Sequence, residues 1–229
     1  MAADRTAADY RAMAKDTVDK LLTYEKDTRG WKHIKTSDGV SMYTKNSHEF
    51  DGNIVKLEYT VNASLQELLE VSFDFEWLKS FDDRLEILDV VEVIDESEKL
   101  EIVYSLSGKL LLGLVSSREF VILAGTKPHP EKDGAIILHN HSIEHPKFPE
   151  VKGRIRGKTY ASGRFMYSAE GDPTKVRCVE FGQTDAKVSI PKVVQQQIAP
   201  KAIIPRLAKF ISKAESRIKE ERKTYGVKK

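Results

Sequence analysis

The run from His139 to His145 holds the residues of this chain whose types and spacing come nearest to a chemical site. His139 and His141 lie two residues apart, so on a strand their imidazoles share one face, as ligands of a metal ion often do. A catalytic zinc would need a third protein ligand further along the run. The interpretation we favour is that both imidazoles face solvent while Leu138 and Asn140 face inward. We therefore expect no metal and no cofactor.

Two other patterns lack residues that their chemistry requires. Gly108 and Gly113 are spaced like the glycines of a phosphate-binding loop, but Leu114 and Val115 stand where a lysine and a hydroxyl residue are needed. Cys178 is the only cysteine, and no nucleophile motif surrounds it, so we expect a core residue. A single cysteine excludes an internal disulfide and suits a reducing compartment, which favours a cytoplasmic location.

Composition limits the possible partners. Hydrophobic residues make up 40% of the 229 residues and charged residues 31%, a balance typical of soluble globular proteins. The net charge is only +2, so no strong basic field exists to bind nucleic acid. The first sixteen residues mix acids and bases without the apolar run of a signal peptide, and no apolar run is long enough to cross a bilayer. We expect one domain over residues 1–229, and a monomer.

Hydrophobic periodicity predicts the elements that must position any site. An amphipathic helix is expected within residues 1–28, followed by three short strands up to Val61. Ser64 with Glu67 forms a capping-box signature that opens a helix of roughly ten residues. Six further strand-like segments then follow between Leu85 and Ala186, one of them over residues 157–168. Their connections are too short for crossover helices, so the sheet should be antiparallel.

Two segments could cover a cavity on this sheet. A long helix is expected over residues 190–222, with Pro200 and Pro205 predicted to kink it. The 107–116 loop sets four leucines near two glycines and is a candidate gate. These leucines are Leu110, Leu111, Leu112 and Leu114.

Several motifs occur in an order that resembles the START lipid-transfer family, from about Trp31 to about Ile211. Trp31 followed by the run SDGVSMYTK is similar to the family's opening tryptophan and DGV strand pair. The run SREFV at 117–121 is similar to its Arg-Asp-Phe-Val strand, with Glu119 in place of aspartate. The family's HP, P, KG and R pattern is matched by His145-Pro146, Pro149, Lys152-Gly153 and Arg156. Asp185 and the run SIPK at 189–192 resemble its last strand and lid helix.

The resemblance implies an α+β helix-grip fold: a curved antiparallel sheet of about nine strands wrapped around the C-terminal helix, with an internal hydrophobic tunnel. Some sterol-binding members carry a buried acid and arginine on adjacent strands. Register from Arg118 places these positions at Ser105 and Ala124, so the pair is missing here and the tunnel should be mostly apolar. Strand and helix periodicity predicts the lining residues Ser105, Phe120, Ile122, Ala124, Leu138, Asn140, Thr159, Val194, Ile198 and Ala202. Arg118 is a candidate headgroup contact, and a structural ion pair is its alternative role.

We therefore expect a non-catalytic intracellular protein that encloses one lipid, such as a sterol, phospholipid or sphingolipid. It would exchange the lipid during transient membrane contact, by opening of the C-terminal helix and the 107–116 loop. One alternative is an enzyme, since helix-grip relatives include cyclases and hydrolases; it would need an acid or base in the cavity, and the predicted lining contains none. A lipid sensor that reports to a protein partner is the other alternative.

Overall fold

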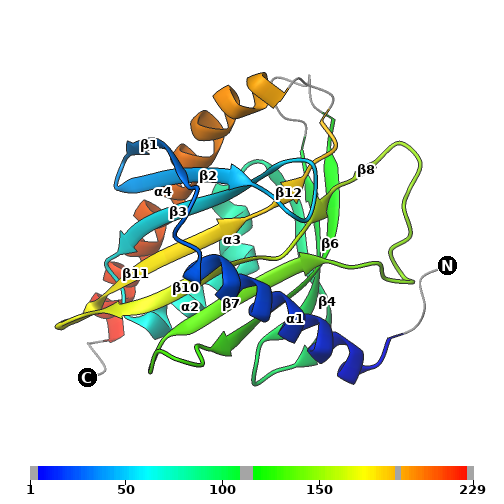
Figure 1. Cartoon of the computed structure of the whole chain (residues 1–229). Helices are drawn as coiled ribbons and strands as arrows, with labels where there is room; N and C mark the ends of the chain where they lie inside the picture. Colours follow the sequence, from blue (N-terminus) through cyan, green and yellow to red (C-terminus); the bar gives the residue numbers. More distant parts are fainter. Residues whose placement is uncertain (1–4, 109–115, 189–191, 226–229) are drawn as a thin grey trace.

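The computed structural model describes residues 5–108, 116–188 and 192–225, with the backbone alone described for 192–198 and 225. A curved sheet carries helices on both of its faces (Figure 1). The helices are α1 (Ala7–Lys26), α2 (Leu65–Phe73), α3 (Phe75–Phe81) and α4 (Lys192–Tyr225). The strands are β1 (Lys32–Ser37), β2 (Val40–Asn46), β3 (Asn53–Val61), β4 (Leu85–Asp95), β5 (Leu100–Ser107), β6 (Arg118–Pro128), β7 (Ile136–Ser142), β8 (Ile155–Arg156), β9 (Lys158–Thr159), β10 (Ser162–Ala169), β11 (Asp172–Gly182) and β12 (Thr184–Asp185).

The main sheet follows the order β1-β2-β3-β11-β10-β7-β6-β5-β4, and each neighbouring pair in this order is antiparallel. β8 pairs with β6 in parallel, and β9 with β12 forms a separate two-stranded sheet. A curved antiparallel sheet of about nine strands with a long C-terminal helix was the predicted fold class, and it is confirmed. None of the helices in the part that the structure describes has an apolar stretch long enough to span a bilayer.

The two faces of the sheet carry different helices. α1 lies across one face, which we call the α1 face, and its Leu21 packs in one cluster with Ile137 and Phe165 of the sheet. α2, α3 and α4 lie across the opposite face, the α4 face (Figure 1). There, Ile204 of α4 packs in one cluster with Met166 of β10. Both faces are therefore covered, and the strands between them are interior.

Most of the predicted elements are confirmed with small shifts of their ends. α1 occupies the predicted N-terminal segment, and β1, β2 and β3 are the three expected strands. α4 begins and ends slightly later than predicted and continues without a break through Pro200 and Pro205. One helix was not predicted: α3 is short and follows α2 at once, because Asp74 ends α2 and its carboxylate accepts a hydrogen bond from the Trp77 amide (2.9 Å).

One predicted strand is divided in two. The segment 157–168 was expected to be continuous, but Tyr160 and Ala161 separate β9 from β10. The Tyr160 amide donates to the carbonyl oxygen of Gln183 (2.8 Å), and Thr159 on β9 pairs with Thr184 on β12. β9 therefore lies off the main sheet, which has consequences for the site.

α1 approaches the sheet closely at Gly163 on β10. A Cβ atom at this position would lie 2.3 Å from the carbonyl oxygen of Leu138 and 2.6 Å from Cδ1 of Leu21. Because neither the strand backbone nor the buried leucine has room to move, only glycine fits beneath the helix.

The Ser64→Ala variant is expected to lose about 1 kcal/mol of unfolding free energy. Ser64 Oγ accepts from the Glu67 amide (3.3 Å), and the Glu67 carboxylate accepts from the Ser64 amide (2.7 Å), so both halves of the predicted capping box are present. Urea denaturation at neutral pH measures the loss, with Ser64→Asn as a control that retains a capping side chain. Equal losses in the two variants would contradict a capping role.

Candidate functional site

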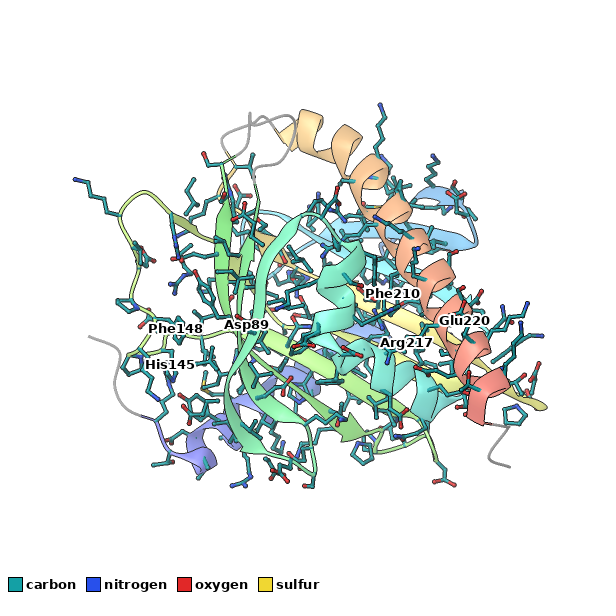
Figure 2. The ribbon with its side chains drawn as sticks, turned by 180° about the vertical axis from the view of Figure 1, so that it is seen from behind. Asp89, His145, Phe148, Phe210, Arg217 and Glu220 are labelled. Carbon is teal, nitrogen blue, oxygen red and sulfur yellow. The ribbon has the colours of Figure 1, made fainter. Side chains whose placement is uncertain are left out.

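Side chains on the interior strands β6 and β7 alternate between two unequal environments. Toward α1, Val121, Leu123 and Ile137 have no exposed surface. Toward α4, Phe120 and Ile122 remain half-buried. Figure 2 shows this side of the sheet with α2, α3 and α4 in front of it. The side chains of β6 and β7 that point toward α1 are thus packed more completely than those that point to the opposite side. Phe120 and Ile122 therefore keep accessible apolar surface on the α4 face, although their strand is interior to the sheet.

Six of the ten predicted lining residues share the α4 face. They are Ser105, Phe120, Ile122, Ala124, Leu138 and Asn140. Phe120 lies opposite Ser105, whereas Ala124 lies between Glu101 on β5 and Asn140 on β7. Ser105 and Ala124 are therefore not direct cross-strand partners. The strand parity behind these placements agrees with the structure, and contact with a ligand stays a prediction.

The structure places two predicted lining residues apart from these six. Thr159 lies on β9 rather than on the main sheet, and its amide donates to Ser142 Oγ (2.8 Å). Ala202 is exposed, because the buried stripe of α4 passes through Ile204 and Leu207. The remaining predictions fall outside the described residues, namely the side chains of Val194 and Ile198 on α4, and the gate residues Leu110, Leu111, Leu112 and Leu114.

Arg118 does not have the role predicted for it. Its side chain is buried, and its Nε donates to the carbonyl oxygen of Ala186 (2.8 Å) and its Nη2 to that of Lys187 (3.2 Å). Nη1 donates to the carbonyl oxygen of Ser116. All three guanidinium nitrogens thus bind main chain, and no ion pair forms with another described residue. Arg118 ties the start of β6 to the segment after β12, so it is unsuited to a headgroup.

The α4 face carries an ion pair that sequence reasoning missed. Nε of Arg164 on β10 lies 2.9 Å from Oε2 of Glu180, its cross-strand partner on β11. The Tyr59 hydroxyl donates to the same oxygen (2.8 Å), and Nη1 of Arg164 donates to Ser72 Oγ (3.3 Å). The Phe210 ring of α4 lies 5.3 Å from the guanidinium carbon. A charged pair is therefore enclosed between the sheet and the C-terminal helix.

The break between β9 and β10 explains why this pair was missed. With a continuous strand, an inward Thr159 would place Phe165 inward and Arg164 outward. The break reverses the parity, so Phe165 joins the core cluster of the α1 face and Arg164 points toward α4. Pairing of Ser162 with Asn140 fixes this register, but only the structure reveals that pairing.

Glu101 adds a second carboxylate to the α4 face. It lies on β5 at the same parity as Ser105, so strand periodicity could have found it. Its Oε1 is buried and has no hydrogen-bond partner among the described residues. Burial raises the pKa of Glu101 above its usual value. Its cross-strand neighbours, Val93 and Ala124, are apolar.

Ion pairs fasten the C-terminal part of α4 to the rest of the protein. Arg206 Nε lies 2.8 Å from Asp82 Oδ2, and Arg217 Nη1 lies 2.7 Å from Asp74 Oδ2 at the junction of α2 and α3. Arg222 Nη2 lies 2.6 Å from Glu67 Oε2 on α2. Among the described side chains of α4, these ion pairs run from Arg206 toward the end of the helix.

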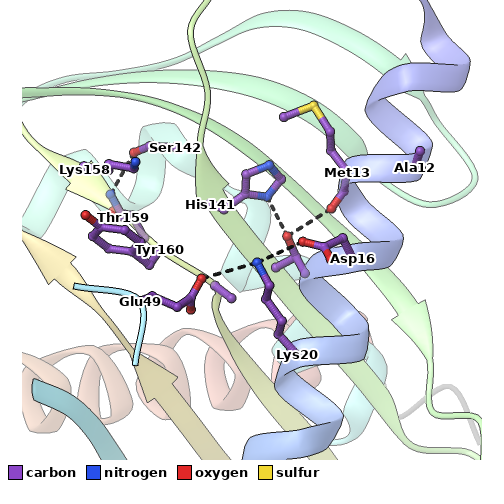
Figure 3. Close-up of a pocket in the computed structure, with 12 residues that line it drawn as sticks. Ala12, Met13, Asp16, Lys20, Glu49, His141, Ser142, Lys158, Thr159 and Tyr160 are labelled. Carbon is purple, nitrogen blue, oxygen red and sulfur yellow. Dashed lines mark hydrogen bonds and ion pairs between the residues drawn. The ribbon is translucent and has the colours of Figure 1, made fainter. Parts of the chain in front are cut away.

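A separate pocket of about 610 Å³ lies on the α1 side of the molecule (Figure 3). Lys20 of α1 bridges Asp16 (3.0 Å) and Glu49 (3.4 Å) at its rim, and Thr159 lies in its wall. Its lining includes none of the six residues placed on the α4 face. Both of its carboxylates pair with Lys20, whereas the Lys158 ammonium lies 4.8 Å from the centre of the Tyr160 ring.

The two histidines do not face solvent, which corrects the favoured interpretation of the His139 run. α1 covers this part of β7, so His139 is 1% exposed and His141 is half-buried. His141 Nδ1 lies 2.8 Å from the Thr17 hydroxyl on α1. Within the described ranges, no group of three or more His, Cys, Asp or Glu residues is arranged to hold a metal ion.

Comparison with known proteins gives a consistent result. The START domain family model matches residues 13–213. StAR-related lipid transfer protein 6 of Homo sapiens is 26% identical over 214 residues, which span 93% of this chain and 94% of that protein. StAR-related lipid transfer protein 5 of Mus musculus is 29% identical over 202 residues, 85% of this chain and 92% of that protein. The solved structure of human StAR-related lipid transfer protein 5 superposes with a TM-score of 0.80 at 26% identity, covering 94% of this chain and 99% of that one.

Proposed function

Because the chain belongs to the START domain family, we propose that it is a lipid-binding and lipid-transfer protein that encloses one hydrophobic ligand between the α4 face and α4. The observation that carries this proposal is the half-buried state of Phe120, Ile122 and Leu138 on interior strands, on the face of the sheet that carries α4. Apolar surface left accessible inside a protein is stabilised by an apolar ligand, at about 25 cal/mol for each Å² that the ligand covers. The names of the relatives as lipid transfer proteins support the same function.

We infer that the protein does not catalyse a reaction. Glu101 and Glu180 do place carboxylates on the α4 face, which the enzyme alternative requires. Glu180, however, is held by Arg164 and Tyr59, and the cross-strand neighbours of Glu101 are apolar. Burial raises the pKa of the Cys178 thiol to about 12, so it stays protonated and is a poor nucleophile. No acid and base converge on a common point in the described part of this face.

Exchange of the ligand requires α4 to move, and the ion pairs suggest where it bends. Ion pairs hold α4 to the rest of the protein from Arg206 onward. Pro200 and Pro205 both precede Arg206 in the helix. Proline removes a helical hydrogen bond and weakens the helix locally. We therefore place the hinge near these prolines, with the preceding turns of α4 as the moving part.

Filling the α4 face should block lipid uptake. The Ala124→Trp variant is expected to transfer dehydroergosterol and pyrene-labelled ceramide between vesicles at least about tenfold more slowly than wild type, because the indole occupies the space that a ligand needs. Ala8→Trp places the same indole on the exposed side of α1 and is the matched control. Unimpaired transfer by folded Ala124→Trp protein would contradict this ligand site, and no transfer by wild type would contradict the function itself.

Three further features belong to the same proposal. Residues 1–229 act as one domain, since β3 from the first part of the chain pairs with β11 from the last part within one sheet. The protein works as a monomer in the cytoplasm, as the buried lone Cys178 and the mixed surface charge favour. It contacts a membrane surface transiently when α4 opens.

A further inference from the structure

The Arg164–Glu180 pair is enclosed but not sealed from the space beneath α4. Its side chains keep 15% and 30% of their surface accessible, although both lie on interior strands. Phe210 of α4 lies over the guanidinium, and the Tyr59 ring lies 5.7 Å from it on the sheet side. The accessible surface of the Arg164 and Glu180 side chains therefore lies on the α4 face, next to the rings of Tyr59 and Phe210.

Both members of the pair retain unused hydrogen-bonding capacity. Glu180 Oε2 accepts from Arg164 and Tyr59, whereas Oε1 accepts no hydrogen bond from any described residue. Arg164 uses Nε and Nη1, and its Nη2 has no partner among the described residues. A guanidinium only donates and a carboxylate only accepts, so the pair offers one donor site next to one acceptor site.

The charges in this region are already balanced. Arg164 and Glu180 neutralise each other, and burial raises the pKa of the Tyr59 hydroxyl well above its usual value, which keeps it uncharged. Burial also raises the pKa of Glu101 and so favours its neutral form. A ligand that brought a net charge beneath α4 would leave that charge without a counterion in an apolar surrounding, which is strongly unfavourable.

We propose that the Arg164–Glu180 pair binds the polar end of the ligand, and that this end is an uncharged group, such as a hydroxyl or an amide, that both donates and accepts a hydrogen bond. The proposal rests on the proposed lipid-binding function and narrows it to neutral lipids with one small polar group. It excludes lipids whose headgroup carries a phosphate. It also explains why a charged pair is kept on a face that otherwise serves an apolar ligand, since ligand binding satisfies donors and acceptors that are otherwise open.

Three pyrene probes of equal chain length test this assignment by fluorescence titration. Pyrenedodecanol carries a terminal hydroxyl, dodecylpyrene carries none, and pyrenedodecyl phosphate carries a charged group. We expect wild-type protein to bind the alcohol at least about tenfold more tightly than either of the others, the factor typical of one hydrogen bond to a charged group. The variant Arg164→Met/Glu180→Leu should bind the alcohol and the hydrocarbon within about twofold of each other, because an apolar pair of similar size cannot distinguish them.

A matched control removes an ion pair elsewhere. Lys15→Gln/Asp19→Asn eliminates an exposed pair on α1 and should keep the wild-type preference for the alcohol. Equal binding of alcohol and hydrocarbon by wild type, or tightest binding of the phosphate, would overturn the polar site while leaving lipid binding intact. Absence of binding of all three probes by wild type would instead count against the proposed function. The wild-type comparison decides the question even if the double variant does not fold.

Discussion

Acidification from about pH 7 to about pH 4.5 is expected to lower the free energy of unfolding by about 2 to 3 kcal/mol for each of the buried histidines His139 and His141. Burial beneath α1 lowers the pKa of His139 from 6.5 to about 3 and that of His141 to about 4. The unfolded chain, with ordinary histidine pKa values, binds these protons near pH 6.5 while the folded protein does not. Titration of the two histidines therefore does not affect the free energy of unfolding well above pH 6.5. Below about pH 6.5 it lowers this free energy progressively, until the folded histidines themselves protonate.

The surroundings of the two rings explain why protonation is so unfavourable. Neither ring nitrogen of His139 has a hydrogen-bond partner among the described residues, and its ring lies against Gly125. His141 contacts the Thr17 hydroxyl; nearby Lys20 disfavours a charge on its ring, whereas Asp16 and Glu49 favour one and offset part of the effect of burial. His139 and His141 also repel each other when charged, and Lys127 disfavours a charge on His139. A buried charge without a counterion is costly, so the folded state resists these protons.

The measurement is urea denaturation at several pH values between 6 and 5. Most carboxylates of the unfolded chain are already ionised in this range, so each buried histidine contributes more to the slope than any single carboxylate. The His139→Met variant should reduce the slope by about 1 kcal/mol per pH unit, whereas His48→Gln, at an exposed position, should leave it unchanged. A His139→Met slope equal to that of wild type would contradict the assignment. At pH 7 the variant should be at least as stable as wild type, because it removes two buried nitrogens without partners.

The same histidines show where sequence reasoning reaches its limit. Alternation along β7 correctly separated Leu138 and Asn140 from His139 and His141. Alternation along a strand predicts which side chains share a face of the sheet, but it does not predict which element covers that face. The position of α1 depends on contacts between Leu21 and strands more than a hundred residues away, which no local pattern encodes. The histidines were therefore assigned to solvent, although a helix buries them.

The Arg164–Glu180 pair was missed for a related reason. Parity must be counted along one uninterrupted strand, and the hydrogen bond from Tyr160 to Gln183 moves the chain out of the main sheet before β10 begins. The lining residues on β5, β6 and β7 were found because each of these strands is continuous through the predicted positions. Local periodicity thus predicts the correct face for side chains within one continuous strand. It predicts the wrong face beyond a break in the strand that long-range contacts impose.

The single variant Arg164→Met is expected to lose about 3 to 5 kcal/mol of unfolding free energy, the second large effect that the structure predicts. It leaves the Glu180 carboxylate on an interior strand with only the Tyr59 hydroxyl as a partner. It also removes the contact between the guanidinium and Phe210, and so weakens the attachment of α4 to the sheet.

The double variant Arg164→Met/Glu180→Leu should recover most of this loss, because it removes the unpaired charge as well. Chemical denaturation of wild type, both single variants and the double variant forms a complete cycle, with Lys15→Gln at an exposed ion pair expected to change stability by less than about 0.5 kcal/mol. A double variant as unstable as Arg164→Met would show that packing of the arginine stem matters more than its charge. Recovery of the unfolding free energy in the double variant would show that the fold is stable without the Arg164–Glu180 pair. The presence of this pair on the α4 face would then be explained by ligand binding.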